Sequence, residues 1–249
     1  MNTYRTSEIA NLTGLHPNTI RLYEEIGFLT KPRRLPNGYR VYTDLHLGQV
    51  RLIRLALRAE VLQNGLRKVA VGIIRLSAEG RFCEAEGQTR FYIEQIESET
   101  RFAKSAVESV ESILKNREPP KAPPKNRSEA AAALGVTVDT LRNWELNGLV
   151  SIRRMHNGYR VYEAEDMERL LIIRTLRCAN YSLSSILRLM GRLAQPCAVC
   201  VTDTLNTPDE NEEIVSVCDH LLAALAGAKE NAMEMLASLE CMKKITTLQ

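Results

Sequence analysis

The sequence has no long apolar run, although 45% of its 249 residues are hydrophobic. A membrane-spanning helix needs roughly 18 or more consecutive apolar residues, so we expect none in this chain. The first residues also lack the charged and apolar regions of a secretory signal peptide. We therefore expect a cytoplasmic protein, and its length is typical of about two domains.

Cysteine is scarce, with six residues in the chain. In a cytosolic protein of this size, cysteines serve more often as thiols or metal ligands than as a disulfide framework. The patterns of a catalytic site are missing as well. The chain has no Ser/His/Asp set, no glycine-rich phosphate loop and no carboxylate pair placed for acid–base chemistry, and its four histidines are scattered. We expect that the protein is not an enzyme.

The net charge is small, +3 at pH 7, but it is unevenly distributed. Residues 1–58 carry nine Lys and Arg against four Asp and Glu, and residues 125–178 carry nine against seven. Residues 210–240 have seven acidic residues and one Lys. The positive charge is therefore concentrated in two segments, as expected for a protein that binds a polyanion.

Those two segments contain an internal repeat. The run Asn-Gly-Tyr-Arg-Val-Tyr occurs at residues 37–42 and again at residues 157–162. Upstream, residues 7–29 align with residues 128–150, and the identical pairs are Ser7/Ser128, Glu8/Glu129, Ala10/Ala131, Gly14/Gly135, Thr19/Thr140, Arg21/Arg142, Glu24/Glu145 and Gly27/Gly148. A long unit that occurs twice differs from the short, many-fold repeats of a solenoid. It suggests a fused dimer, because most soluble oligomers are two-fold symmetric.

Each copy shows the pattern of a winged helix-turn-helix domain. In the first copy, a short helix ends at Gly14, and a second helix has Pro17 at its first position and stops at Gly27. In the second copy, Gly135 and Gly148 take the same places. A basic stretch and an Asn-Gly turn flanked by Tyr and Val then predict a β-hairpin, which would form the wing.

The segment Thr-Ile-Arg-Leu-Tyr-Glu-Glu-Ile-Gly-Phe-Leu at residues 19–29, followed by Asn-Gly-Tyr-Arg-Val-Tyr, resembles the MerR family of transcription regulators. The second copy carries the same signature. The resemblance implies a dimeric arrangement in which a long antiparallel coiled coil follows the winged domain and two recognition helices reach adjacent major grooves. It also implies double-stranded promoter DNA and RNA polymerase as partners.

Two stretches with apolar residues at alternating steps of three and four predict long coiled-coil helices. The first seam comprises Ile93, Ile96, Thr100, Ala103, Val107, Val110 and Leu114. The second comprises Ile214, Cys218, Leu221, Leu225, Ala228, Ala232, Met235, Leu239 and Met242. If the two seams pair within one chain, the molecule is a monomeric pseudo-dimer. The alternatives are a homodimer with four winged domains and the packing of each helix on its own domain.

The expected fold is mainly α, with two winged helix-turn-helix domains that have small β-hairpin wings, each followed by a long coiled-coil helix, and the two helices pair antiparallel. The expected divisions are a first winged domain (1–80), a first long helix (81–116), a Pro-rich linker (117–126), a second winged domain (127–194), a Cys-containing loop (195–211) and a second long helix (212–246).

Residues at the start of a recognition helix contact base edges, whereas wing residues contact phosphates. The candidates for base contact are His16, Asn18, Thr19 and Arg21 in the first copy and Thr137, Asp139, Thr140 and Arg142 in the second. Asn18 and Asp139 differ in charge, so we expect the two half-sites to differ. The candidates for phosphate contact are Arg33, Arg34, Tyr39, Arg40, Arg153, Arg154, Tyr159 and Arg160.

Four further aromatic residues lie in the repeats. Tyr23 and Trp144 lie at equivalent positions of the recognition helices, where they could pack against the wing or touch the DNA backbone. Tyr42 and Tyr162 end the two Asn-Gly-Tyr-Arg-Val-Tyr runs. Because side chains alternate along a strand, we expect these two tyrosines to point inward and to form part of the core.

Family regulators often bind an effector at the ends of the coiled coil, frequently with cysteines that hold a metal. In this chain the matching candidates are Cys197 and Cys200, with Cys218 on the second seam, and three thiolates would suit zinc, copper(I) or mercury. Cys83 and Cys241 form a second possible thiol cluster. The alternative for free cysteines is burial without chemistry, which we expect for Cys178.

The sequence thus predicts a DNA-binding transcription regulator that acts as a single-chain pseudo-dimer on a pseudo-palindromic promoter operator and distorts it. A soft metal or a small molecule could be its effector. The alternative is an architectural or excisionase-like protein that bends DNA without an effector.

Overall fold

The computed structural model describes residues 2–58, 65–115, 123–156, 158–195, 199–207 and 220–247. Within these ranges the chain is mainly helical, as predicted, and it divides into two compact units. Unit 1 comprises residues 1–98 and 224–249, and unit 2 comprises residues 99–223. Each unit therefore contains one copy of the repeat together with part of a long helix from the other half of the chain.

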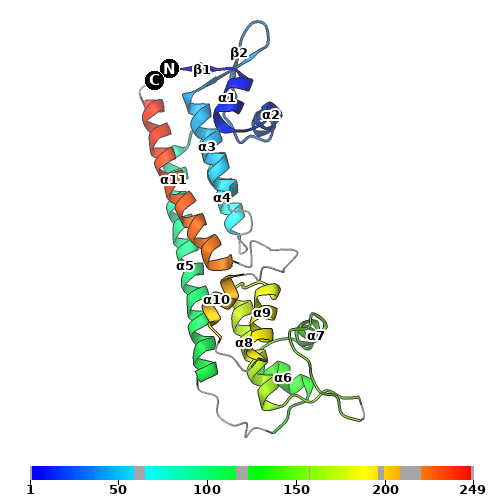
Figure 1. Ribbon diagram of the computed structural model, residues 1–249. Helices are drawn as coiled ribbons and strands as arrows, with labels where there is room; N and C mark the ends of the chain where they lie inside the picture. The colour runs from blue at the N-terminus through cyan, green and yellow to red at the C-terminus, as the bar shows by residue number, and fades with distance from the viewer. Residues whose placement is uncertain are drawn as a thin grey trace. The chain divides into compact units, whose positions relative to one another are not determined.

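The winged domain of unit 1 begins with β1 (Thr3–Tyr4), α1 (Thr6–Thr13) and α2 (Pro17–Glu25), as Figure 1 shows. The wing follows as β2 (Arg33–Arg34) and β3 (Arg40–Thr43), which pair antiparallel in a sheet of order β1-β3-β2. Gly14 ends α1 with a φ of 64°, a left-handed conformation that glycine adopts without steric cost. The predicted helix-turn-helix and wing of the first copy are confirmed.

Three further helices complete the first half of the chain: α3 (Asp44–Arg58), α4 (Leu66–Ala78) and α5 (Phe82–Lys115). The core of the winged domain is formed by apolar side chains from α1, α2, β3 and α3, since a helix buries the residues that recur along one of its faces. Its fully buried members include Ile9, Ile20, Tyr42, Val50, Leu52 and Ile53.

Helix α11 (Leu221–Thr247) belongs to the second half of the chain but packs in unit 1 from residue 224 onward. Helices α11 and α5 run antiparallel, because residues late in α11 pair with residues early in α5. The ion pairs are Lys243–Glu86 (3.2 Å), Arg90–Glu240 (4.0 Å) and Lys229–Glu97 (2.7 Å). The predicted antiparallel pairing of the long helices is confirmed. Since exposed ion pairs stabilise little, the buried seam between the helices supplies most of the attraction.

Six predicted seam residues of α11 are buried, namely Leu225, Ala228, Ala232, Met235, Leu239 and Met242, whereas Leu221 is half-buried. Ile214 and Cys218 of the predicted seam lie outside the described residues. Helix α11 also approaches α3 closely. A Cβ at Gly48 would lie 2.7 Å from Met242 Cγ, so the missing side chain at this position lets the two helices meet. Helix α11 therefore packs on the winged domain of the first copy, whereas the alternative placed each long helix on its own domain.

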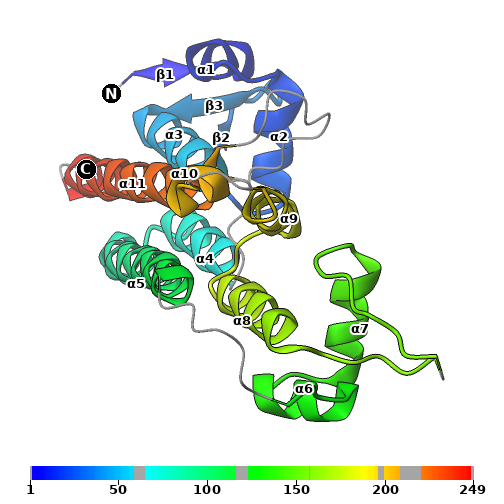
Figure 2. The ribbon, with the colours of Figure 1, turned by 60° about the horizontal axis from the view of Figure 1, so that its bottom comes forward.

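Unit 2 contains the second winged domain, formed by α6 (Arg127–Leu134), α7 (Val138–Leu146), α8 (Ala164–Cys178), α9 (Leu183–Leu193) and α10 (Val201–Asn206). In Figure 2, α7 runs across α6, as expected of a helix-turn-helix. The second half of α5 supplies Ala103, Ala106, Val107 and Val110 to the same hydrophobic core. Each long helix thus contributes to the core of the unit that holds the other copy of the repeat.

The second wing is smaller than the first. Among the described residues of this wing, the pairing consists of isolated bridges between Arg154 and Arg160 and between Lys125 and Tyr162. These pairs correspond to Arg34 with Arg40 and Tyr4 with Tyr42 in the first copy. The hairpin connection is retained, because the Met155 amide donates to the Tyr159 carbonyl at 2.8 Å.

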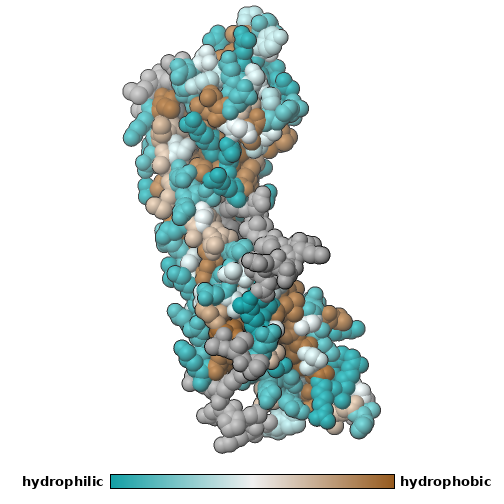
Figure 3. Space-filling view, in the orientation of Figure 1, coloured by the Kyte–Doolittle hydropathy of each residue, from teal (hydrophilic) through white to brown (hydrophobic). Residues whose placement is uncertain are grey.

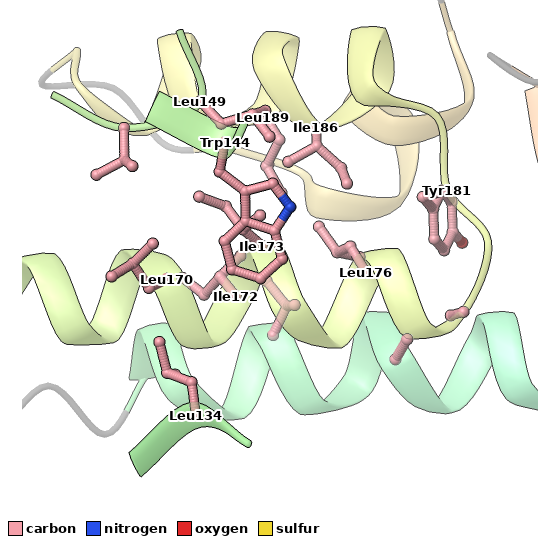
Figure 4. Close-up of a cluster of buried hydrophobic side chains, with 14 of the residues drawn as sticks. Leu134, Trp144, Leu149, Leu170, Ile172, Ile173, Leu176, Tyr181, Ile186 and Leu189 are labelled. Atoms are coloured by element: carbon pink, nitrogen blue, oxygen red, sulfur yellow. The ribbon is translucent and has the colours of Figure 1, made fainter. Parts of the chain in front are cut away.

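Trp144 lies in the core of unit 2 and is 6% exposed. Figure 4 shows its indole among the side chains of α8 and α9, with Ile173 and Leu189 beside it. Of the two alternatives for this residue, packing is therefore the one that the structure favours. Figure 3 shows that hydrophilic residues cover much of the face in view, with hydrophobic residues scattered among them. Among the described helices, none combines the length and hydropathy that a membrane crossing requires.

Candidate nucleic-acid interface

The first recognition helix is α2, and its exposed beginning is organised by its own side chains. His16 caps the helix, since its Nδ1 accepts a hydrogen bond from the Asn18 amide at 3.2 Å. One turn further, Arg21 Nη1 donates to Asn18 Oδ1 at 3.0 Å, which holds the guanidinium over the first turn. His16, Asn18 and Arg21 are exposed, and Thr19 is half-buried. These predicted base-contact residues therefore lie together at the start of one helix.

The second recognition helix, α7, has a different first turn. Thr137 Oγ1 caps the helix by accepting from the Thr140 amide at 3.1 Å, and the two hydroxyl oxygens are 2.8 Å apart. Asp139 stands where the first copy has Asn18, and both Asp139 and Arg142 are exposed. A carboxylate repels phosphate and accepts hydrogen bonds, whereas an amide also donates them. The two helix ends therefore offer different chemistry to a ligand.

The tyrosines of the two wings divide between surface and core. Tyr39 and Tyr159 are 70% and 73% exposed, while Tyr42 and Tyr162 are buried. The expectation that Tyr42 and Tyr162 are core residues is confirmed. Arg33, Arg34, Arg153 and Arg154 are exposed on the wings. Each wing thus presents an exposed aromatic ring and cationic side chains on its surface.

Glu24 of α2 and Glu145 of α7 tie each recognition helix to its wing, a role that the sequence analysis missed. Arg40 Nε lies 2.5 Å from Glu24 Oε2, and Arg160 Nε lies 2.5 Å from Glu145 Oε2. A second arginine completes each cluster: Arg34 lies 3.5 Å from Glu24, and Arg127 lies 3.4 Å from Glu145. The sequence does contain a signal for this role, since both copies of the repeat have a glutamate at this position.

These ion pairs have a consequence for the predicted phosphate contacts. Arg40 and Arg160 are largely buried and already bound to a carboxylate, so at most part of each guanidinium faces solvent. An arginine has five N–H donors, and those not used by Glu24 or Glu145 can still reach a phosphate. The carboxylate therefore positions the arginine and fixes the wing relative to the recognition helix.

We expect Glu145→Gln to lower the free energy of unfolding of unit 2 by about 1.5–3 kcal/mol, because it removes charge-assisted hydrogen bonds to two arginines. Trp144 is the single tryptophan of the chain and lies in the core of unit 2, so its fluorescence during urea unfolding provides the measurement. The matched control is Glu108→Gln on the exposed face of α5, with an expected change within about 0.5 kcal/mol. Equal effects of both variants would contradict the positioning role.

A second pair of residues supports the two helix-turn-helix turns. The Arg54 guanidinium of α3 donates a hydrogen bond to the Thr13 carbonyl at the end of α1. A Cβ at Gly14 would lie 3.7 Å from Arg54, and a Cβ at Gly135 would lie 3.7 Å from Arg174. An arginine of the third helix therefore reaches the turn in both copies.

Tyr23, a predicted DNA contact, is half-buried. Its ring centroid lies 6.2 Å from that of Phe28, and burial raises the pKa of its hydroxyl. The side chain thus packs within the winged domain, although part of it remains exposed.

The cysteines are only partly described. Cys197 and Cys218 of the predicted thiol site lie outside the described residues, and Cys200 is exposed at the start of α10. The described residues contain no group of three or more His, Cys, Asp or Glu that could hold a metal ion. Cys83 and Cys241, the second possible cluster, are both exposed.

The expectation that Cys178 is a core residue is wrong, because this cysteine is exposed. Leu176 occupies the core position in the last turn of α8. Two residues along a helix correspond to a rotation of roughly 200°, so Cys178 lies on the opposite face.

Two helix-turn-helix pairs, each followed by a hairpin connection with an exposed tyrosine, define a protein with two winged helix-turn-helix domains. Comparison with protein families gives the same result at two places in the chain. Residues 5–42 match the MerR family regulatory protein model, and residues 126–193 match the MerR HTH family regulatory protein model. The chain belongs to the MerR family and carries two MerR-like domains in tandem.

Curated relatives match a short part of the chain. The HTH-type transcriptional regulator CueR of Escherichia coli O6:H1 is 50% identical over 50 residues, which cover 20% of this chain and 37% of that protein. CueR of Salmonella typhi is also 50% identical over 50 residues, or 36% of its length. The nodulation protein NolA of Bradyrhizobium sp. (strain NC92) is 41% identical over 75 residues, which cover 28% of this chain and 32% of NolA. The match thus spans about a third of the length of each of these relatives. No solved structure shows a significant match.

Proposed function

We propose that this protein is a sequence-specific, DNA-binding transcription regulator of the MerR type that acts in the cytoplasm on promoter DNA. The observation that carries the proposal is the tandem pair of winged domains, each with an exposed recognition-helix start and an exposed cationic wing. The CueR relatives are named transcriptional regulators, which supports the same function. RNA polymerase at the promoter is the protein partner that this function requires.

We further propose that one chain acts as a pseudo-dimer. Helix α11 packs antiparallel to α5 in unit 1, and the second half of α5 enters the core of unit 2. This reciprocal exchange gives each winged domain a long helix from the other half of the chain, as a two-fold dimer gives each protomer a helix from its partner. A single chain then supplies both halves of the DNA-binding assembly.

In this proposal the recognition helices select the sequence and the wings hold the backbone. Arg21 and Arg142 contact bases, and the two half-sites differ because Asn18 is replaced by Asp139 in the second copy. The exposed wing residues Arg33, Arg34, Tyr39, Arg153, Arg154 and Tyr159 bind phosphates, together with the free donors of Arg40 and Arg160. Binding of both domains to one operator distorts the DNA, at an energy that depends on the deformed sequence.

A thiol-bound soft metal remains a candidate effector. The proposed ligands are Cys197, Cys200 and Cys218, whose thiolates would select zinc or copper(I). Because two of these residues lie outside the described part of the chain, the metal site depends on the Cys-x-x-Cys spacing alone.

Native mass spectrometry with a footprinted duplex from the region upstream of its own gene tests the proposal. We expect one chain per duplex of about two helical turns, the spacing that two recognition helices require. The same spectrum reports any bound metal. Two chains per duplex would overturn the pseudo-dimer in favour of a homodimer, and the absence of any complex with specific DNA would overturn the DNA-binding function.

A further inference from the structure

Unit 1 contains a cavity of about 770 Å³ between α3 and the C-terminal part of α11. This volume lies in the range of roughly 300–1,000 Å³ that is typical of small-molecule sites. Apolar side chains form part of the lining, among them Leu47 and Leu55 of α3 and Met242 and Ile245 of α11. The cavity can therefore accommodate the apolar body of an organic ligand.

Three arginines of α3 give the cavity its polar character. Arg51, Arg54 and Arg58 all line it, and their spacing places them on one face of the helix. The lining also includes two carboxylates, Asp44 and Glu234. Cationic side chains thus outnumber acidic ones, as expected for a site that receives an anion.

The Asp44 carboxylate already has hydrogen-bond donors within the protein. It accepts hydrogen bonds from the Tyr4 hydroxyl at 2.7 Å and from the Asn2 amide at 2.9 Å. The Tyr4 hydrogen bond lowers the pKa of Asp44, so this carboxylate is ionised and satisfied. By contrast, the described residues provide neither Arg51 nor Arg58 with a hydrogen-bond or ion-pair partner. Their guanidinium groups are available to a ligand.

Comparison of the two copies shows that this lining is specific to the first. The core residues of α3 have apolar counterparts in α8, such as Val50 with Leu170 and Ile53 with Ile173. The cavity positions have diverged: Arg51 corresponds to Leu171, Arg58 to Cys178 and Gly48 to Glu168. A fold requirement would apply equally to both copies, as it does for Arg54, whose counterpart is Arg174. Arg51 and Arg58 have no arginine counterpart in the second copy and therefore need another explanation.

The cavity is also connected to the recognition helix. Tyr23 of α2 forms part of its wall, and Arg54 of the lining donates to the Thr13 carbonyl at the helix-turn-helix turn. A ligand bound to the arginines would therefore contact groups that hold both helices of the motif. On the other side it would contact α11, which comes from the second half of the chain.

We propose that this cavity binds a small organic anion with an apolar body, such as an aromatic or aliphatic carboxylate or sulfonate, and that this ligand is an effector of the protein. Arg51 and Arg58 bind the anionic group, and Leu47, Leu55 and Ile245 contact the apolar body. The effector role rests on the DNA-binding function proposed above, whereas the binding site does not.

The binding site is tested on the full-length protein without DNA. The probes are anilinonaphthalene sulfonate, which is anionic, and phenylnaphthylamine, which has a similar aromatic body without the charge. We expect one sulfonate site per chain by calorimetry and fluorescence. Replacement of both Arg51→Gln and Arg58→Gln should weaken sulfonate binding by about tenfold or more, because charge-assisted hydrogen bonds are lost, and should change binding of the neutral probe by less than about twofold.

Two further variants test whether the probes bind in this cavity. Ser238→Trp places an indole in the cavity and should abolish binding of both probes, while Arg169→Gln removes an exposed arginine of α8 and should leave binding unchanged. Circular dichroism establishes that each variant is folded. The absence of a sulfonate site, or equally tight binding by the double arginine variant or by Ser238→Trp, would overturn the proposal.

The effector role is tested by measuring affinity for the footprinted duplex with and without saturating anilinonaphthalene sulfonate. We expect a change of about 5–150-fold, the usual range of coupling between two sites, and no response in the double arginine variant. If the wild-type protein binds the probe and DNA independently, the effector role is wrong and the binding site stands. If no duplex binds even without the probe, the proposed function fails and the effector role fails with it, while the binding result is unaffected.

Discussion

Replacement of Met235 by alanine is expected to lower the free energy of unfolding of unit 1 by about 2–5 kcal/mol. Met235 is fully buried in the seam of α11, so the substitution removes apolar contacts and leaves a cavity. The effect would show that a helix from the second half of the chain stabilises the first winged domain. Urea unfolding followed by circular dichroism gives the loss, and hydrogen exchange of residues 5–58 shows whether the winged domain is affected.

Met233 provides the matched control, since it lies two residues away on the same helix and is 57% exposed. We expect Met233→Ala to change the stability by no more than about 0.5 kcal/mol. Faster exchange confined to α11 in the Met235→Ala protein would contradict the reciprocal packing. It would mean that the first winged domain is stable without the second half of the chain.

Alanine at Arg21 is expected to weaken binding to the operator by about 1–3 kcal/mol, or roughly 5–150-fold, and to relax specificity at one base position. The reason is that Arg21 lies exposed at the start of the recognition helix and is oriented by Asn18. Arg142→Ala should have a similar effect on the other half-site. Losses from two such independent contacts add, so the double variant should show the largest decrease in affinity. Fluorescence anisotropy with operator and scrambled duplexes measures each loss.

Two comparisons distinguish base contact from phosphate contact. Arg34→Ala on the wing should weaken binding to all duplexes alike and lower the slope of log affinity against log salt by about one. Arg101→Ala, an exposed arginine of α5, should change neither quantity. An equal loss on operator and scrambled DNA for Arg21→Ala would mean that this arginine binds the backbone rather than a base.

Local patterns allowed most of the secondary structure to be predicted. Gly14 and Gly135 both end a helix in the left-handed conformation, and Thr137 caps α7 through its hydroxyl. The residues from Leu225 to Met242 at steps of three and four are buried, because a helix presents every third or fourth residue to the same neighbour. These features depend on residues that are close in sequence, so a single sequence contains the information.

The local sequence pattern was less informative at positions where distant residues meet. It identified Arg40 and Arg160 as phosphate ligands but missed Glu24 and Glu145, which hold them at 2.5 Å. It assigned Cys178 to the core, although Leu176 takes that position. Helical periodicity shows which residues share a face of the helix, but it does not show which face is buried. A cysteine near the helix end is weak evidence for that choice.

The sequence by itself determined that the chain contains two MerR-like winged domains and two long helices, since repeats, caps, turns and apolar periodicity are local properties. The tertiary structure alone decided that α11 packs on α3 of the first copy, that Gly48 makes room for Met242, and that three arginines line a cavity there. The physical reason is that an apolar helix face can be buried against many surfaces of similar hydrophobicity. The partner is selected by shape and close packing between residues nearly two hundred positions apart, which no local pattern encodes.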